Sequence, residues 1–311
     1  MNTNSSRPLP FAIITDAAPL GDDGVAISML LASPRIDIKL IVCASGNFWA
    51  EDVAVNVRAL LARFKRTDIP VVVGLPASAH FRRVESFVAR LQVTKMFYSG
   101  ALARPIPPST SAHSDGYKEL AAAIRDTKAL NIFIAGPPSA AVAAIHEAKK
   151  DIKNIGRVFM MGGALHVRGN ATPKAEFNFW FDPEAADSIL GSGLDITLVP
   201  LDATDRLRYS ETQIKSLPSD RPGAAYLKEY IATRKVRSKN PLHIWDEALS
   251  AIVLDRGLIE SCSIVRLRVA TRQLDYGKLE FTSDAERGPV KLVTEINADR
   301  ISACIIEVLS R

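Results

Sequence analysis

FAIITDAAPLGDDGVAISMLLA, residues 11–32, contains the pattern that decides the fold expected for this chain. Phe11 to Thr15 is a short apolar run that predicts a buried strand, and Gly24 to Ala32 predicts a helix. The turn between them is polar and contains a proline, a glycine and three aspartates. A strand, a turn and a helix in this order are typical of α/β proteins.

The same alternation continues to about residue 201. Apolar runs expected to be strands lie at 38–44, 71–73, 132–135, 158–161 and 196–199. Segments with helical spacing lie at 53–64, 117–124, 140–148 and 183–190. Strands that are apolar throughout and separated by helices predict an α/β fold with a mainly parallel central sheet and helices on both faces.

The C-terminal third has a different rhythm. Residues 211–250 look mostly helical, 265–269, 278–281 and 290–293 look like shorter strands that could be antiparallel, and 298–309 predicts a last helix. Since no linker is recognisable, we expect a single domain over 11–311 after a flexible leader, 1–10. The least regular stretch, 79–114, could be a loop or lid over a site.

The bulk properties narrow the class of protein. With 311 residues, 47% of them hydrophobic, the chain can bury a large core. No apolar run approaches the roughly 20 residues that span a bilayer, so we expect a soluble protein with no membrane partner. Cys43, Cys262 and Cys304 are too few and too far apart for a disulfide framework or a zinc site, which favours a reducing, cytoplasmic location.

The charge does not indicate a nucleic-acid partner. A formal charge of +5 is mild for this length. One basic cluster stands out, and we expect it to be a solvated helix face: Arg234, Lys235, Arg237 and Lys239.

The turn after the first strand carries the first candidate chemistry. Asp22 and Asp23 could simply cap a helix, but capping does not explain a third carboxylate at Asp16. Crowded carboxylates repel each other unless a cation or a proton intervenes, and hard oxygen ligands favour Ca²⁺ or Mg²⁺. Other polar residues also follow predicted strands, at Asn47 and Asp202 among others, so the polar chemistry collects at one edge of the sheet.

Two further groups of residues could bind a small molecule. Asn170, Glu176 and Asn178 are polar residues in apolar surroundings, which could hold sugar hydroxyls or could simply hydrogen-bond a loop. Asp246 opens an apolar helix and could be an N-cap, and Trp245 beside it could be core or a stacking platform for a planar ligand.

The order of these motifs resembles that of the nucleoside hydrolase family across nearly the whole chain. The stretch from Met161 to Ala186, with Met-Gly-Gly, Gly-Asn, Ala-Glu-Phe-Asn and Asp-Pro-Glu-Ala, is the most specific part of the resemblance. The other matching segments are Gly46-Asn47, Gly136-Pro137-Pro138-Ser139, Leu201-Asp202-Ala203-Thr204 and Asp246.

The resemblance implies hydrolysis of the N-glycosidic bond of ribonucleosides, with a Ca²⁺-bound water as the nucleophile. It implies that Asp23, Asp246 and the carbonyl of Ser139 are metal ligands. It places the ribose against Asp22, Asn170, Glu176 and Asn178, with Asn47 and Met161 nearby. Carboxylates so close to the ring, Asp22 above all, would stabilise an oxocarbenium-like sugar.

The resemblance also bears on the base and on assembly. Purine-preferring members have a tryptophan at the position of Trp245, which favours a purine stacked on the indole. His243 could protonate the leaving base, although a lone histidine is more often structural. Family members are dimers or tetramers, so a homodimer or homotetramer is implied.

One position breaks the pattern. Ala18 occupies the place of the family's second aspartate, which is both a calcium ligand and the general base. In one interpretation Asp16 takes over as ligand or base, since residues two apart on a strand share a face. In the other, the protein binds ribonucleosides but is catalytically impaired. An unrelated phosphotransferase needing a second aspartate is disfavoured by the same alanine.

Overall fold

The computed structural model describes residues 7–75, 115–209, 211–237, 243–272 and 275–311. An eight-stranded sheet lies at its centre, in the order β3-β2-β1-β4-β5-β6-β10-β7. All neighbours are parallel except β7, which pairs antiparallel with β10 at one edge. The strands are β1 (Leu9–Thr15), β2 (Ile36–Cys43), β3 (Val71–Val73), β4 (Leu130–Ala135), β5 (Ile155–Met161), β6 (Ile196–Val199), β7 (Ile259–Val265) and β10 (Val290–Ile296).

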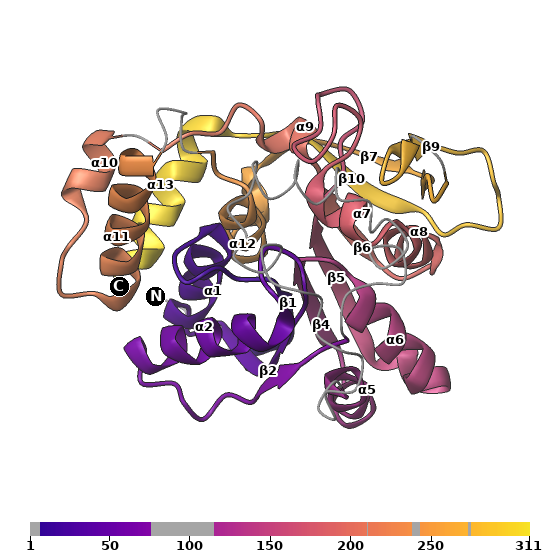
Figure 1. The fold of residues 1–311 in the computed structure, drawn as a ribbon, viewed down its shortest axis with the longest axis horizontal. Helices are drawn as coiled ribbons and strands as arrows, with labels where there is room; N and C mark the ends of the chain where they lie inside the picture. Colours follow the sequence, from indigo (N-terminus) through magenta and orange to yellow (C-terminus); the bar gives the residue numbers. More distant parts are fainter. Residues whose placement is uncertain (1–6, 76–114, 210, 238–242, 273–274) are drawn as a thin grey trace.

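Alternation along β1 divides the interior into two apolar layers. Phe11 and Ile13 face one layer, whereas Ala12 and Ile14 face the other. The first layer is covered by α1 (Asp22–Ala32), α2 (Ala50–Arg63), α11 (Pro222–Arg237), α12 (Asp246–Leu254) and α13 (Ala298–Leu309). The second is covered by α5 (Gly116–Asp126), α6 (Ser139–Ala148) and α8 (Pro183–Gly191), and Figure 1 shows the two groups on opposite sides of the sheet.

The helices that follow residue 201 close the first layer. They are α9 (Leu201–Thr204), α10 (Glu211–Ser216), α11, α12 and α13. The hydroxyl of Ser250 on α12 donates to the carbonyl of Ala26 on α1 at 3.0 Å. A β-carbon added to Gly24 would lie 2.0 Å from the hydroxyl oxygen of Tyr226, so glycine permits the close approach of α11 to α1. These contacts bring two helix N-termini, those of α1 and α12, toward the same place.

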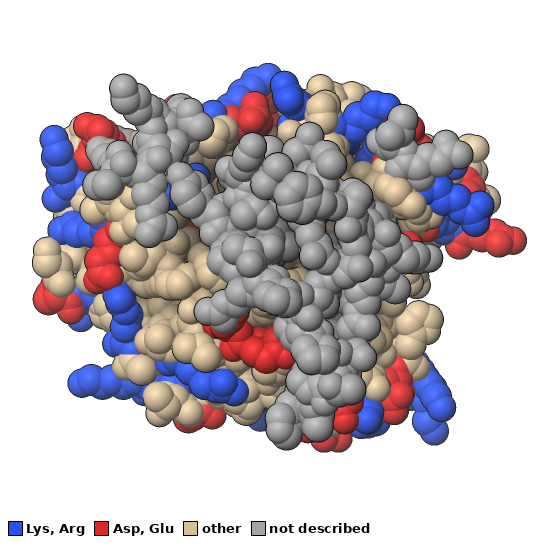
Figure 2. Space-filling view, in the orientation of Figure 1, with Lys and Arg blue, Asp and Glu red and all other residues tan. Residues whose placement is uncertain are grey.

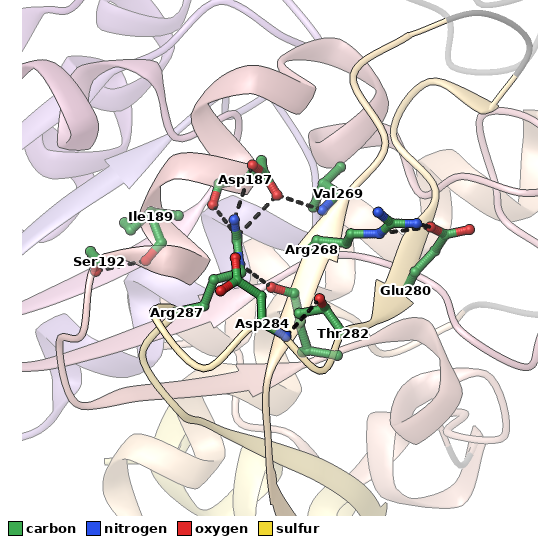
Figure 3. Close-up of polar contacts among 10 residues, drawn as sticks. Asp187, Ile189, Ser192, Arg268, Val269, Glu280, Thr282, Asp284 and Arg287 are labelled. Carbon is green, nitrogen blue, oxygen red and sulfur yellow. Dashed lines mark hydrogen bonds and ion pairs between the residues drawn. The ribbon is translucent and has the colours of Figure 1, made fainter.

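A small hairpin of β8 (Leu267–Val269) and β9 (Leu279–Phe281) packs beside α8. Figure 3 shows Arg287 between this hairpin and α8. Its guanidinium forms an ion pair with Asp187 at 3.0 Å and donates to the carbonyl of Leu267 at 2.8 Å. The other carboxylate contact of Asp187 is with the backbone N–H of Val269, at 2.8 Å. This polar network therefore anchors the hairpin.

The hairpin supports the segment that precedes and contains α7 (Phe177–Phe181). A β-carbon on Gly163 would lie 2.7 Å from the side chain of Leu279, and one on Gly277 would lie 2.5 Å from the backbone of Trp180. Both glycines have positive φ, of 81° and 76°, which an L side chain rarely adopts. The backbone around Gly163 is thus held closely on one side by the hairpin.

The fold class predicted from the alternating pattern is confirmed, including the parallel sheet and the helical, short-strand C-terminal part. Some boundaries differ. β7 begins at Ile259, before the strand expected at 265–269, and the chain turns into β8 after Val265. β1 begins at Leu9, inside the expected leader, whose first six residues lie outside the described chain. The possible lid at 79–114 also lies outside the described residues.

The surface of the described residues agrees with the mild net charge. On the face drawn in Figure 2, lysine and arginine side chains are interspersed with acidic ones around the periphery. In the described part of the chain, no helix is long and apolar enough to cross a membrane.

Candidate active site

A pocket of about 680 Å³ opens where the loops after β1, β2 and β5 meet α7, α11 and α12. Most of the residues predicted for the site contribute to its lining. They are Asp16, Asp22, Asn47, Met161, Asn170, Glu176, Asn178, Trp245 and Asp246. The location agrees with the expectation that polar residues at the carboxyl ends of parallel strands form one site.

Three carboxylates converge beside this pocket, and two of them, Asp22 and Asp246, line it. Asp22 and Asp23 are the first residues of α1, and Asp246 is the first residue of α12. One oxygen from each lies within 4.8 Å of the others. Asp23 and Asp246 are 1% and 5% exposed, and Asp22 is half-buried. The two helix dipoles favour negative charge here, which explains how the fold tolerates the carboxylates but not why there are three.

The electrostatics of the three carboxylates point to a cation. Burial raises the pKa of Asp23 and of Asp246 well above the usual range, and the charges of neighbouring aspartates raise both further. A hydrogen bond of 2.5 Å from the Thr15 hydroxyl holds one oxygen of Asp23. Three clustered carboxylates, two of them buried, fit a hard divalent cation such as Ca²⁺ or Mg²⁺. Asp22, which the resemblance assigns to the ribose, therefore also lies at the candidate metal site, as the crowding of the three aspartates in the sequence suggests.

Asp16 lies next to this group without belonging to it. Asp16 directly follows β1 and is 1% exposed. Its carboxylate accepts a hydrogen bond of 2.6 Å from the N–H of Asn47. A β-carbon on Gly46 would lie 2.1 Å from that carboxylate, so the glycine makes this contact possible. Burial raises the pKa of Asp16 to about 7; the Asn47 N–H lowers it, and the charge of Asp22 raises it.

Ala18 also lines the pocket, in the loop between Asp16 and α1. Its methyl group offers no oxygen to a cation and accepts no proton. Of the two residues, only Asp16 therefore presents a carboxylate to the pocket.

The residues predicted to hold a sugar line the same pocket. Glu176 is the N-cap of α7 and accepts from the N–H groups of Asn178 and Phe179, at 2.8 and 3.2 Å. It also accepts from the N–H of Gly163 at 3.0 Å. Asn170 accepts from the N–H of Phe177 at 2.8 Å, which leaves its amide NH₂ as a donor. These residues therefore hydrogen-bond the loop, as one interpretation predicted, and they also line the pocket where the other interpretation places a sugar.

Two predicted residues lie elsewhere. Ser139 begins α6, and its hydroxyl donates to Asp182 in a short hydrogen bond rather than lining the pocket. His243 is not part of the pocket lining either, and it stacks on Trp245 with ring centroids 5.1 Å apart. Burial, and then the charge of Arg208, lower the pKa of His243. Such a histidine is suited to support the indole rather than to donate a proton.

Several lining residues escaped the sequence analysis. Phe48 and Phe177 add aromatic walls, and Tyr230, Thr233 and Arg234 reach the pocket from α11. The expectation that the basic cluster is a solvated helix face is wrong for Arg234, which is half-buried and lines the pocket. A usable signal was the spacing of Tyr226, Tyr230 and Arg234, which puts all three on one face of a helix.

Buried carboxylates around a cation-sized space, beside polar groups suited to hydroxyls and beside aromatic walls, define a class of α/β protein that binds a small polar ligand next to a metal ion. Comparison with known proteins then identifies the family. Residues 13–303 match the model of the inosine-uridine preferring nucleoside hydrolases, and the chain belongs to this family.

Curated relatives agree over a shorter range. The pyrimidine-specific ribonucleoside hydrolase RihA of Escherichia coli O1:K1 / APEC is 32% identical over 199 residues, which are 62% of this chain and 61% of the relative. RihA of Salmonella arizonae is 30% identical over 208 residues, 65% of this chain and 64% of the relative. The matches thus span about three fifths of the length of these curated relatives.

Solved structures agree over almost the whole chain. A plant nucleoside hydrolase, the PpNRh1 enzyme, superposes with a TM-score of 0.81 at 25% identity, covering 97% of this chain and 99% of that one. A purine-preferring ribonucleoside hydrolase from Gardnerella vaginalis has a TM-score of 0.79 at 20% identity, covering 97% and 98%. The latter likeness supports the fold alone. Similar proteins therefore carry names with opposite base preferences.

Proposed function

We propose that this chain hydrolyses the N-glycosidic bond of ribonucleosides, releasing the free base and ribose, in the pocket between α1, α7, α11 and α12. The observation that carries the proposal is the convergence of Asp22, Asp23 and Asp246, from two helix N-termini, at a pocket that the sugar-binding candidates Glu176 and Asn178 also line.

In this proposal Asp22, Asp23 and Asp246 hold one Ca²⁺. Burial raises the pKa of all three, and neighbouring carboxylates raise those of Asp23 and Asp246 further, so a cation is needed for them to ionise together at neutral pH. When bound, the ion neutralises these carboxylates and lowers the pKa of water at the site. Ser139 remains a predicted ligand through its carbonyl. Its placement at the first residue of α6, beside Asp182, does not support that role.

Asp16 is the proposed general base. Its carboxylate lies in the pocket, and its pKa of about 7 suits a group that accepts a proton at neutral pH. The oxygen of the attacking water bonds to the anomeric carbon, and one water proton passes to Asp16. The bond from that carbon to the base nitrogen breaks, and its electron pair leaves with the base, which finally acquires a proton from solvent.

The remaining residues orient the ribose and stabilise its charge. Asn178, Glu176 and the free amide of Asn170 line the wall on which the hydroxyls would hydrogen-bond. Asp22 and its neighbouring carboxylates place negative charge near the ring, which stabilises an oxocarbenium-like carbon. Fixed carboxylates and amides of this kind act without reorganising during the reaction.

We further propose that a purine is the preferred base. Trp245 lines the pocket beside Asp246 and is backed by His243, so that the indole can stack on a bicyclic ring. The names of the curated relatives indicate pyrimidines, so the proposed preference rests on the position of Trp245.

The test is release of ribose from inosine, adenosine, guanosine, uridine and cytidine in the presence of Ca²⁺, followed by a reducing-sugar assay. We expect turnover that is lost on chelation and lost in Asp246→Asn. A matched control is Asp255→Asn, which changes a half-exposed aspartate at the other end of α12. Failure of the folded, calcium-loaded protein to release base from any of the five would refute hydrolysis.

A second candidate function is favoured by Ala18 alone: a binding protein for ribonucleosides that does not turn them over. It predicts thermal stabilisation by a nucleoside without release of base, and gain of turnover in Ala18→Asp.

We also propose a homodimer or homotetramer in the cytoplasm, consistent with free cysteines at 43, 262 and 304. Light scattering and cell fractionation test these two points.

A further inference from the structure

One face of α11 runs from the start of α1 into the pocket. Tyr226, Tyr230 and Arg234 are four residues apart and so lie on this face in succession. The hydroxyl of Tyr226 accepts a 3.1 Å hydrogen bond from the N–H of Gly21, directly before α1. Each following residue lies about 6 Å further along the helix axis. Arg234 is therefore about two turns beyond the contact with the loop that carries Ala18.

The guanidinium of Arg234 has no partner among the described residues. Its Nε is buried without a hydrogen bond, and no described carboxylate lies within 4.0 Å of its nitrogens. Yet Arg234 lines the same pocket as four carboxylates, and its charge acts on Asp22. A buried N–H donor such as this Nε, left without a partner, is unfavourable unless a ligand supplies the acceptor. A ligand bound in the pocket can supply that acceptor.

The position of Arg234 indicates which end of a nucleoside it would meet. The sugar-binding candidates Glu176 and Asn178 belong to α7 and its cap. Arg234, in contrast, reaches the pocket with Thr233 and Trp245, and its charge also acts on His243, which stacks on Trp245. Arg234 is thus on the side of the indole, where the proposed function puts the base.

We propose that Arg234 stabilises the departing nucleobase by donating hydrogen bonds to the base atoms that gain negative charge as the N-glycosidic bond breaks. This inference rests on the proposed hydrolysis and deepens it. The electron pair of the broken bond moves onto the base nitrogen and is delocalised over the ring, and the guanidinium interacts with that charge. No proton leaves Arg234; the base takes its proton from solvent, and the water proton taken by Asp16 returns to solvent.

This role requires no general acid beside the base. His243, the other candidate to assist the leaving group, is not in the lining and has a lowered pKa. An arginine cannot act as a general acid near neutral pH, but it stabilises an anion without being deprotonated. A base that leaves as an anion beside a fixed guanidinium needs no acid.

The test compares two kinds of leaving group in Arg234→Met, which keeps the apolar stem and removes the charge. The first substrate is the best nucleoside found for the wild-type protein, and the second is p-nitrophenyl β-D-ribofuranoside, whose phenolate leaves without assistance. We expect kcat/KM for the nucleoside to fall about 10²-fold, mostly in kcat, as when one preorganised donor to a developing anion is removed. For the nitrophenyl riboside we expect a fall of less than about threefold, because little charge stabilisation is needed.

Two further variants make the result specific. Arg234→Lys keeps the charge and should recover part of the nucleoside rate. Arg221→Met removes the same charge from an exposed arginine beside the start of α11 and should leave both substrates unchanged. Thermal unfolding and calcium binding by calorimetry confirm that each variant keeps the site.

An equal loss on both substrates, or no loss on the nucleoside, would overturn the role of Arg234 while leaving the proposed function intact. Wild-type protein that is inert toward both substrates with Ca²⁺ present would instead overturn the proposed function itself. A loss confined to KM on both substrates would assign Arg234 to binding and would likewise reject its part in bond breaking.

Discussion

Replacing Asp16 by asparagine is the sharpest test of how a chain with Ala18 could still catalyse hydrolysis. The amide has nearly the shape of the carboxylate, and its oxygen can still accept the hydrogen bond from the Asn47 N–H, now 2.6 Å long. The close contact with Gly46 is also preserved, so the strand end should not rearrange. What the variant loses is the ability to take a proton from water.

The expected size follows from that loss. Removing a general base typically costs about 10²- to 10⁴-fold in rate, or about 2.7 to 5.4 kcal/mol in activation free energy. The folded protein should not become less stable, because burial and the charge of Asp22 both disfavour the carboxylate that the variant removes. We therefore expect Asp16→Asn to unfold at the wild-type temperature or above it, with unchanged calcium affinity and a kcat lowered by that factor.

The assay is initial-rate release of reducing sugar at saturating nucleoside, with unfolding followed by circular dichroism. Ala18→Asp, measured alongside, should change kcat by only a few-fold if Asp16 already acts as the base. An Asp16→Asn protein that keeps more than about a third of the wild-type kcat would refute the assignment. A gain of 10² or more in Ala18→Asp would show that the natural chain lacks a working base.

Three other outcomes follow from the same contacts. Metal-free protein should lose stability as the pH rises from 3.8 toward 7, because the buried carboxyl of Asp16 has a pKa of about 7 in the folded protein and near 3.8 in the unfolded chain. Chemical unfolding after chelation measures this change, and a rise in stability over that range would contradict it. Asp187→Ala should cost about 1–3 kcal/mol in the free energy of unfolding, because Arg287 loses its ion pair and a backbone N–H loses its acceptor; an unchanged urea midpoint would count against the anchoring role of the hairpin network. Trp245→Ala should raise KM for purine nucleosides by about tenfold and for pyrimidine nucleosides less, since stacking is worth about 0.5–1.5 kcal/mol beyond area burial; equal effects on both would reject the purine preference.

Most of the candidate site could be predicted from the sequence because its residues follow strands. Asp16 comes directly after β1 and Asn47 soon after β2, and parallel strands bring their carboxyl ends to one edge. Glu176 and Asn178 were recognisable as polar residues in an apolar segment, although the helix α7 that they begin was not expected. Its five residues are too few to show a helical period.

Arg234, which the sequence analysis misplaced, and His243, whose role it left open, depend on distant contacts. Arg234 looks like part of a solvated basic stretch, yet α11 turns it into the pocket because Tyr226, on the same face of the helix, packs against α1 and its loop. His243 is two residues from Trp245 and could have pointed into the site, but the ring stacks on the indole instead. Neither outcome could be deduced from local spacing, since both depend on which face of one element meets another.

The sequence by itself determined the alternation of strands and helices, and hence the parallel sheet and the edge at which polar residues collect. Those features come from local periodicity and burial, which each segment expresses alone. Only the tertiary structure decided that Asp246 joins Asp22 and Asp23 within 4.8 Å, and that Arg234 faces the same pocket without a described partner. The physical reason is that charges far apart in the chain are brought together by the packing of α11 and α12 on α1, which involves residues that no single segment contains.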